Sequence, residues 1–267
     1  MGMGRDGTRP GRRHACMPAF AAIVLLASMA SAQAAFLQDK GTTQYIHSAG
    51  ISSFSRAFDA KGRLKRASSF SKTALDIFIG HGLTDAVSLI GEVSSNRMIP
   101  RILTDTDVDS GTMWSAMAGV RARLWHDGTS IVSIQALAGG GRDIGRAGMV
   151  GDVRLLLGHN FSLAGYHGFA DLQAGYRRNA PGSRPELRFD ASLGLRLHRD
   201  VQIIGQVLTA HGFRHAGQPQ SLRVKTALSL AWDVTKTWTI QLGGFVTAYG
   251  INTGRETGAT LAVWRRF

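Results

Sequence analysis

Apolar and polar side chains alternate along several segments of this chain. In residues 222–232 every second side chain from Leu222 to Trp232 is apolar or is threonine, whereas Arg223, Lys225 and Ser229 occupy the other face. Residues 186–197 repeat the pattern with apolar side chains from Leu187 to Leu197. A period of two predicts β-strands. Strands with one apolar and one charged face are typical of transmembrane β-barrels, in which lipid surrounds the apolar face and the polar face lines the lumen.

Twelve segments carry such a pattern, and short turns alternate with longer polar loops between them. We expect strands near residues 43–57, 69–81, 86–95, 112–125, 130–139, 149–158, 166–177, 187–197, 201–210, 221–232, 238–249 and 258–267. Short turns are expected at 82–85, 126–129, around His159 and Asn160, at 198–200 and at 233–236; long loops are expected at 58–68, 96–111, 140–148, 178–186, 211–220 and 250–257. Short turns face the periplasm in such barrels. The sequence therefore predicts an all-β fold, a closed antiparallel transmembrane β-barrel of about 12 strands.

A soluble β-sandwich or lipocalin is the alternative, because a sheet with one wet face also alternates. In a soluble barrel, however, the apolar face would line the interior. Twelve strands enclose more volume than these small apolar residues fill, so the polar interior is favoured. Beyond the first 34 residues no apolar run approaches the length of a membrane helix, which argues against an inner-membrane protein.

Aromatic residues are expected where strands cross the two membrane interfaces. The predicted girdle consists of Trp114, Tyr166, Tyr176, Phe189, Trp232, Trp238 and Trp264. The chain ends Val-Trp-Arg-Arg-Phe, and a terminal aromatic after alternating residues resembles the signal that the outer-membrane assembly machinery reads. Phe267 is therefore the expected assembly signal, and Arg265 departs from the apolar residue usual two positions earlier.

The first 32 residues predict a secretory signal peptide. Four arginines precede an apolar segment at 19–30, which is followed by Ala30-Ser31-Ala32 and Ala32-Gln33-Ala34 as cleavage motifs. We expect residues 1–32 to be the signal, with cleavage after Ala32 or Ala34, and residues 33–267 to be the barrel, exported through the general secretory pathway to the outer membrane. A retained anchor is the alternative. The single cysteine, Cys16, lies within the signal, so the mature chain forms no disulfide.

The mature chain is strongly basic. Without the four arginines and Asp6 of the signal, the 31 basic and 18 acidic residues fall to 27 and 17, a net charge of +10. The basic residues are spread over strands and loops without a basic helix or an aromatic-interleaved motif, so nucleic acid is not an expected partner. We expect the partners to be outer-membrane lipid and lipopolysaccharide, the barrel assembly machinery, and an acidic or neutral extracellular polysaccharide.

Strand parity directs a set of charged side chains into the lumen. They are Asp76, Glu92, Arg121, Arg123, Asp152, Arg154, Asp171, Arg177, Arg188, Asp190, Arg196, Arg223 and Lys225. One interpretation is a ladder of ion pairs that fills and rigidifies the barrel. The other is a narrow pathway whose excess of arginine favours anions.

Catalytic and metal motifs are weak. His167 with Ser162, or His211 with Ser221, offers a base and a nucleophile for a lipid-modifying hydrolase, but no nucleophile motif surrounds either serine. Asp105, Asp107 and Asp109 alternate in one loop without the glycine and distal glutamate of an EF-hand. We therefore expect no enzyme activity, catalytic residue, metal or cofactor.

The segment 41–92 resembles the XagA-like outer-membrane proteins. The resemblance rests on Arg56-Ala57-Phe58-Asp59, Gly62-Arg63-Leu64, Phe70-Ser71-Lys72 and Gly82-Leu83-Thr84-Asp85, and covers about the first quarter of the mature chain. That family is linked to autoaggregation and to gene neighbourhoods for extracellular polysaccharide. The resemblance implies a cell-surface role in polysaccharide export or autoaggregation, with Arg56, Asp59 and Arg63 as surface-loop contacts. An anion-preferring channel is the second hypothesis, and a lipid-modifying hydrolase is the third.

Overall fold

The computed structural model describes residues 35–100, 111–143, 146–181, 183–215 and 217–267, and these residues form one barrel. Its strands are β1 (Thr43–Phe58), β2 (Leu64–Thr84), β3 (Val87–Pro100), β4 (Thr112–His126), β5 (Ser130–Asp143), β6 (Arg146–Leu163), β7 (Tyr166–Arg178), β8 (Glu186–His198), β9 (Val201–Gly212), β10 (Ser221–Asp233), β11 (Trp238–Ile251), β12 (Thr253–Gly254) and β13 (Thr257–Arg266). The alternation of apolar and polar side chains explains why these segments form strands. Each strand has one face toward lipid and the other toward the polar lumen.

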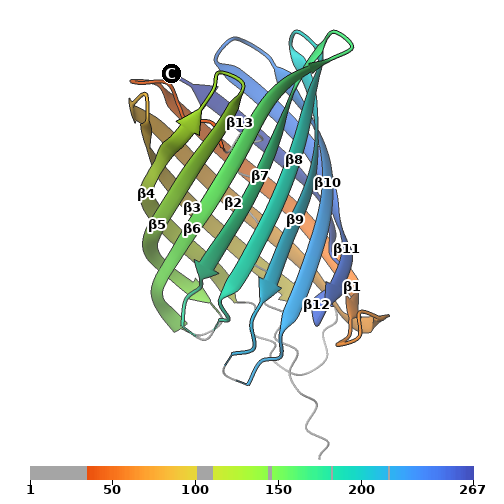
Figure 1. Cartoon of the computed structure of the whole chain (residues 1–267). Helices are drawn as coiled ribbons and strands as arrows, with labels where there is room; N and C mark the ends of the chain where they lie inside the picture. Colours follow the sequence, from red (N-terminus) through yellow and green to blue (C-terminus); the bar gives the residue numbers. More distant parts are fainter. Residues whose placement is uncertain (1–34, 101–110, 144–145, 182, 216) are drawn as a thin grey trace, which may run out of the picture.

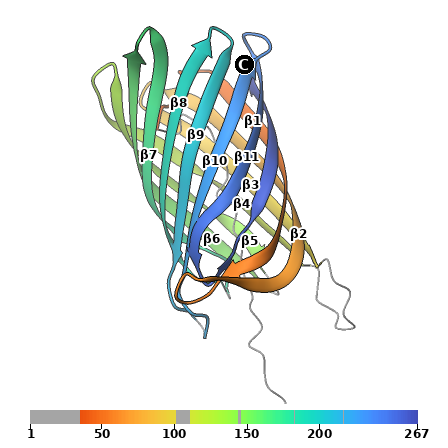
Figure 2. The ribbon, with the colours of Figure 1, turned by 90° about the vertical axis from the view of Figure 1, so that its right-hand side faces the viewer.

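Every long strand pairs antiparallel with its neighbours in chain order, and β1 pairs with both β2 and β13. The pairing of β1 with β13 closes the sheet, as Figures 1 and 2 show from two sides. The two-residue strand β12 continues this closing pairing opposite Ala57 and Phe58 of β1. The predicted closed antiparallel β-barrel of twelve long strands is confirmed. Among the described residues no helix is long and apolar enough to cross a membrane.

The connections differ between the two ends of the barrel. At the end that carries the C-terminus, β2–β3, β6–β7 and β8–β9 are each joined by two residues; we call this the short-turn end. At the opposite, long-loop end, residues 179–185 and 213–220 connect strands. Strands extend further into most of these loops than expected, and β5 and β6 are joined by residues 144–145 alone where 140–148 was predicted.

One predicted turn was wrong. The turn expected around His159 and Asn160 lies five residues later, because β6 continues through Leu163. The chain reverses at Ala164 and Gly165, which have positive φ angles of 49° and 82°. Two consecutive residues of positive φ form the two-residue hairpin turn that matches strand twist, and the glycine adopts that conformation without strain.

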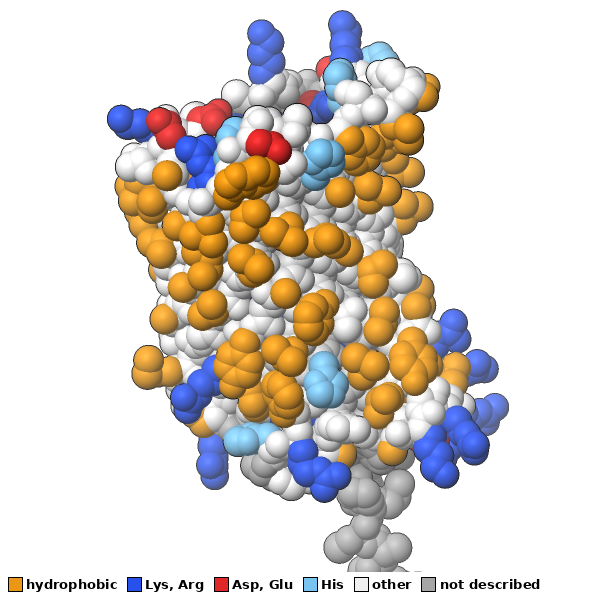
Figure 3. All heavy atoms as spheres, in the orientation of Figure 1, with side chains coloured by type: hydrophobic (Ala, Val, Ile, Leu, Met, Phe, Trp, Pro, Cys, Tyr) orange, Lys and Arg blue, Asp and Glu red, His pale blue; other side chains and the backbone are white. Residues whose placement is uncertain are grey.

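The outer surface carries an apolar band. Large side chains on alternate strand positions are exposed, including Leu75, Val93, Leu155, Leu193 and Leu228. In Figure 3 hydrophobic side chains cover the middle of the barrel wall, and charged side chains gather at its two ends. This distribution is that of a barrel surrounded by lipid.

Six of the predicted girdle aromatics are exposed on the outer wall, and one is not. Trp264 is 7 % exposed and belongs to the buried apolar cluster, so its placement in the girdle was wrong. The reason is the period of two, which puts Trp264 on the opposite face from Phe267 and Arg265. The guanidinium of Arg265 lies 4.8 Å from the ring centre of Trp238 and 4.4 Å from that of Phe267, so this arginine stacks on outer aromatics.

Candidate functional sites: the charged lumen and the basic hairpin

The charged residues expected in the lumen divide into a buried and a partly exposed set. The buried set comprises Glu92, Arg121, Asp152, Arg154, Asp171, Arg177, Arg188, Asp190, Arg223 and Lys225. Asp76, Arg123 and Arg196 are partly exposed. Arg196 lies at the short-turn rim and forms an ion pair with Asp233 of 2.9 Å.

Ion pairs form within single strands and between β6 and β8 inside the barrel. Arg154 of β6 contacts Asp152 at 2.7 Å and reaches Asp190 of β8 at 3.3 Å. Arg188 pairs with Glu186 at 2.9 Å. Buried charges require such partners because the interior supplies little water to solvate them. Arg154 therefore connects β6 to β8 across β7, and these paired charges occupy part of the lumen along that wall.

A second cluster links both sides of the closing strands and was missing from the sequence analysis. Glu256, between β12 and β13, lies 2.6 Å from Lys72 of β2 and 2.6 Å from Lys225 of β10. It also accepts a hydrogen bond from Ser52 at 2.5 Å. All three charged side chains are at most 4 % exposed. The two lysines share one carboxylate, so we call this arrangement the Lys72–Glu256–Lys225 clasp.

Buried charge inside the described part of the barrel is almost balanced. Eight buried residues are basic: Lys72, Arg121, Arg154, Arg177, Arg184, Arg188, Arg223 and Lys225. Seven are acidic: Glu92, Asp143, Asp152, Asp171, Glu186, Asp190 and Glu256. The large basic excess of the chain is therefore carried by exposed residues. Figure 3 shows these at the ends of the molecule.

The chain preceding β1 enters the lumen. Residues 35–38, which we call the N-terminal segment, are buried or partly buried. The backbone nitrogen of Ala35 donates to Asp171 at 2.6 Å, and the carbonyl of Ala35 accepts from Ser133 at 2.8 Å. Arg121 donates to the carbonyl of Phe36 at 3.3 Å. Charged and polar lumen groups thus hold the backbone of this segment.

Two glycines make room for the N-terminal segment. A Cβ atom on Gly158 would lie 2.7 Å from the ring of Phe36 and 2.9 Å from Cβ of Ala35. A Cβ atom on Gly82 would lie 2.6 Å from the carbonyl oxygen of Gln38. Both contacts are shorter than van der Waals separation, so the segment fills space that any other residue at these positions would occupy.

A cluster of exposed basic residues lies at the long-loop end. It consists of Arg56, Lys61, Arg63, Lys65 and Arg66 on the β1–β2 hairpin and Arg255, whose backbone nitrogen donates to the carbonyl of Arg56 at 2.9 Å. We call this cluster the basic hairpin. Arg56 and Arg66 are direct cross-strand partners. Like charges placed opposite each other are unfavourable in isolation and favour an anionic ligand between them.

Asp59 organises the tip of the basic hairpin. Its carboxylate accepts hydrogen bonds from the backbone nitrogens of Lys61 at 2.8 Å and Arg63 at 2.9 Å, and pairs with Lys65 at 2.9 Å. The Lys65 contact and the two backbone N–H groups lower the pKa of Asp59 to about 2. Gly62, at φ 72°, provides the positive angle that this tight turn requires. Asp59 therefore fixes the loop, while Arg56 and Arg63 remain exposed.

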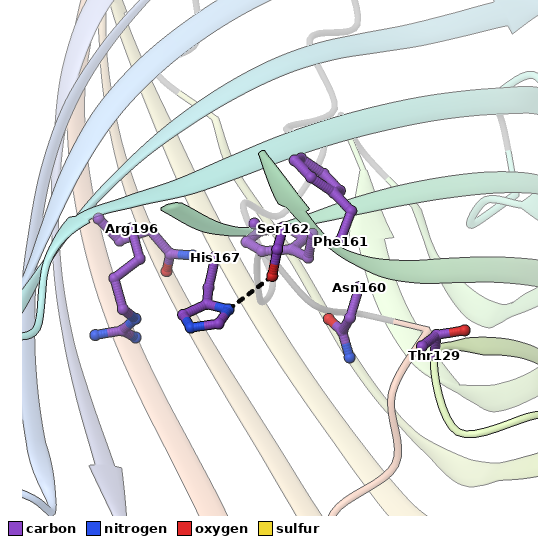
Figure 4. Close-up of a pocket in the computed structure, with 9 residues that line it drawn as sticks. Thr129, Asn160, Phe161, Ser162, His167 and Arg196 are labelled. Carbon is purple, nitrogen blue, oxygen red and sulfur yellow. Dashed lines mark hydrogen bonds between the residues drawn. The ribbon is translucent and has the colours of Figure 1, made fainter. Parts of the chain in front are cut away.

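The two serine–histidine pairs that could serve catalysis differ in their geometry. Ser162 and Nδ1 of His167 lie 3.0 Å apart beside a cavity of about 390 Å³ at the short-turn end, and Figure 4 shows them pointing at each other. His211 instead lies opposite Leu222 and packs edge-on against Phe213.

The Ser162–His167 contact is one of three similar contacts. Ser130 pairs with His159 at 2.8 Å and Thr43 with His81 at 2.9 Å. In all three the hydroxyl and the imidazole are cross-strand partners at the short-turn end. Repetition of one cross-strand pair is typical of sheet stabilisation. In the described part of the chain no group of three or more His, Cys, Asp or Glu residues is arranged to hold a metal; the loop with Asp105, Asp107 and Asp109 lies outside the described residues.

Comparison with known proteins establishes the fold. No protein-family model matches the chain, and no curated protein matches it. An outer membrane channel from Pseudomonas putida F1 is similar with a TM-score of 0.64 at 14 % identity, over 87 % of this chain and 98 % of that one. The translocator domain of autotransporter NalP from Neisseria meningitidis gives 0.46 at 12 % identity, over 86 % and 90 %. The likeness to the channel shows an outer-membrane type of β-barrel.

Proposed function

We propose that this protein is an outer-membrane barrel that acts at the cell surface, where its basic hairpin binds an acidic extracellular polysaccharide during polysaccharide export or autoaggregation. The observation that carries the proposal is the group of exposed cations on the hairpin, held in place by Asp59. The resemblance of residues 41–92 to the XagA-like proteins covers the same hairpin and supports the same role.

The height of the basic hairpin favours a polymer over lipid head groups. Ile51 is the last large apolar side chain exposed along β1, which continues to Phe58. Seven residues at about 3.3 Å each, tilted by about 40°, rise at most roughly 18 Å above that point, and the tip at Gly62 lies against the ring of Tyr249 on β11. Lipid phosphates lie at the edge of the apolar band. The hairpin therefore presents its cations in the layer that surface polysaccharide occupies.

The interior supports a surface role over transport. Lumen charges such as Arg121, Asp152 and Arg188 are at most 3 % exposed, so other protein atoms cover nearly all of their surface. The numbers of buried basic and acidic side chains are nearly equal, which also removes most of the anion preference that the sequence suggested. We propose that the charges inside are structural and that the protein is not an enzyme.

Binding to a defined polyanion tests this function. We expect purified barrel in detergent to bind alginate, an anionic polysaccharide, and not neutral dextran. The triple variant Arg56→Ala, Arg63→Ala, Arg66→Ala should lose roughly 100-fold in affinity at low salt, because a cation near an anionic surface contributes about 1 kcal/mol. The interaction should weaken as salt is raised.

A matched control removes three exposed cations at the opposite end. The triple variant Lys40→Ala, Arg199→Ala, Lys236→Ala should bind alginate as the unaltered protein does, since these exposed residues lie at the short-turn end. Equal losses in both triples would show unspecific attraction and contradict the proposed site. In cells, the hairpin triple should reproduce the change in clumping or surface polysaccharide caused by deleting the gene.

An anion-preferring channel is the second candidate, favoured by the structural likeness to an outer membrane channel. It requires that the N-terminal segment and the ion pairs leave the lumen. Planar bilayers separate the two functions: steady anion conductance by the unaltered protein, reduced by Arg223→Glu with Lys225→Glu, would support the channel. Absence of conductance together with alginate binding would support the surface role.

A further inference from the structure

The amide nitrogen of Ala35 and the carboxylate of Asp171 meet inside the barrel. We infer that the chain is cut between Ala34 and Ala35, and that the α-ammonium group released at Ala35 forms a buried ion pair with Asp171 which fixes the N-terminal segment in the lumen. The inference does not depend on the surface function proposed above.

The geometry already has the two groups in contact. The nitrogen of Ala35 lies 2.6 Å from Oδ2 of Asp171, and the two residues are 0 % and 1 % exposed. Ala35 also packs with Ile131 and Leu156, with Phe36 and Leu37 against the same cluster. The separation of 2.6 Å suits a charge-assisted hydrogen bond.

Asp171 needs a positive partner. Within the described residues its carboxylate accepts hydrogen bonds from Ala35 and from Gln173 at 2.8 Å, and it takes part in no ion pair within 4.0 Å. The nearby guanidinium of Arg121 is directed to Gln135 and to the carbonyl of Phe36. A buried carboxylate without a direct ion pair is costly, and an ammonium at Ala35 supplies that pair.

A signal-peptidase motif stands directly before the bond between Ala34 and Ala35. Ala32-Gln33-Ala34 places small residues one and three positions before it, the pattern that signal peptidases recognise. Hydrolysis consumes one water molecule: the Ala34–Ala35 peptide bond breaks, the hydroxyl joins the carbonyl carbon of Ala34, and the nitrogen of Ala35 takes up one proton from the water and a second from the new carboxyl group, which leaves an ammonium and a carboxylate. A cut after Ala32 would instead leave two residues between the ammonium and Asp171.

The mass of the protein isolated from outer membranes tests the cut. We expect an intact mass that begins at Ala35 and an N-terminal tryptic peptide of residues 35–40. A mass that begins at Gln33, or a mass that includes the leader, would overturn the inference.

Acetylation of amines tests the ion pair in the same native protein. In the folded barrel the amine of Ala35 should react at least about tenfold more slowly than after heating, because a buried group reacts only through local opening. Lys61 and Lys65 are exposed and should react at once. Rapid acetylation of Ala35 in the folded barrel would refute its burial.

Two variants with matched controls locate the contact. Asp171→Asn should leave the cut unchanged but accelerate acetylation of Ala35 roughly tenfold, since a buried ammonium loses its partner. Asp76→Asn, another lumen carboxyl, should not. Gly158→Val should also expose Ala35 by displacing the segment, whereas Gly205→Val, with nothing within 4 Å of the added Cβ, should have no effect. Heat-modifiable migration verifies folding, and unchanged protection in Asp171→Asn would contradict the ion pair.

Discussion

Removing the negative charge of the Lys72–Glu256–Lys225 clasp should weaken the barrel strongly. Glu256→Gln leaves two ammonium groups, 3 % and 4 % exposed, without the carboxylate that lies 2.6 Å from each. At an effective dielectric constant of about 20, one pair at that distance is worth roughly 6 kcal/mol before the cost of desolvation. Breaking a buried pair typically costs about 3–5 kcal/mol, because the remaining charge stays buried. For a chain of this size that corresponds to a drop in Tm on the order of 10 °C.

The assay is the temperature at which the folded band disappears in detergent gels, supported by denaturant unfolding in lipid. Asp85→Asn removes an acid from an exposed turn and should change the free energy of unfolding by less than about 0.5 kcal/mol. Adding Lys72→Met and Lys225→Met to Glu256→Gln should recover most of the lost stability, since apolar replacement of a buried ion cluster is often neutral. A Glu256→Gln protein as stable as the unaltered one would refute the assignment of the clasp as a stabilising element.

Three further outcomes are expected. Gly194→Val should prevent folding or cost several kcal/mol, because the added Cβ would lie 1.9 Å from the ring of buried Phe169; a Gly205→Val control of equal or lower stability, measured by the same gel assay, would contradict this. Cysteine at Lys61 should react with an impermeant reagent on whole cells and cysteine at Asp127 should not, because the two lie at opposite ends of the barrel; equal labelling would reverse or abolish the proposed orientation. The ordered tip of the basic hairpin should persist well below pH 3.8, since the pKa of Asp59 is lowered to about 2. The stabilising contribution of the Asp59 carboxylate is complete above its ordinary pKa of 3.8 and is lost as pH falls through about 2. An NMR titration midpoint of Asp59 near 3.8 would contradict the loop geometry.

The sequence alone predicted the barrel because the alternation of side chains is imposed by lipid on one side and charge on the other. Strand parity also indicates that Lys72 and Trp264 point into the barrel. Lys72 shares its parity with Asp76, and Trp264 has the opposite parity from Phe267, so the inward position of both was available from the sequence. The turn at Ala164 and Gly165 was missed because Gly158-His159-Asn160 provides a stronger break in the apolar pattern.

Other features depend on closure and were not available from the pattern. Glu256 lies in a stretch that was predicted to be a loop, and it becomes a lumen residue because the strand is interrupted between β12 and β13. Its partner Lys225 lies on β10, two strands away in the same sheet, whereas Lys72 lies on β2, which approaches Glu256 only when the sheet closes. The contact between Ala35 and Asp171 similarly joins a segment outside the strands to the middle of the sequence.

The interrupted strand at the closing seam has a consequence for the order of assembly. Backbone hydrogen bonds join β1 to β13 along the closing seam. The side chain of Glu256, at this seam, contacts Lys72 of β2 on one side and Lys225 of β10 on the other. Lys225 of β10 lies two strands from β13 in the same sheet, whereas Lys72 of β2 is within reach only after the first and last strands have met. The pair of Lys72 and Glu256 is therefore absent while the barrel is still an open sheet, and its energy enters the barrier to reopening and not the rate of closing. Glu256 acts as a latch, and its loss should shorten the lifetime of the finished barrel without delaying its formation.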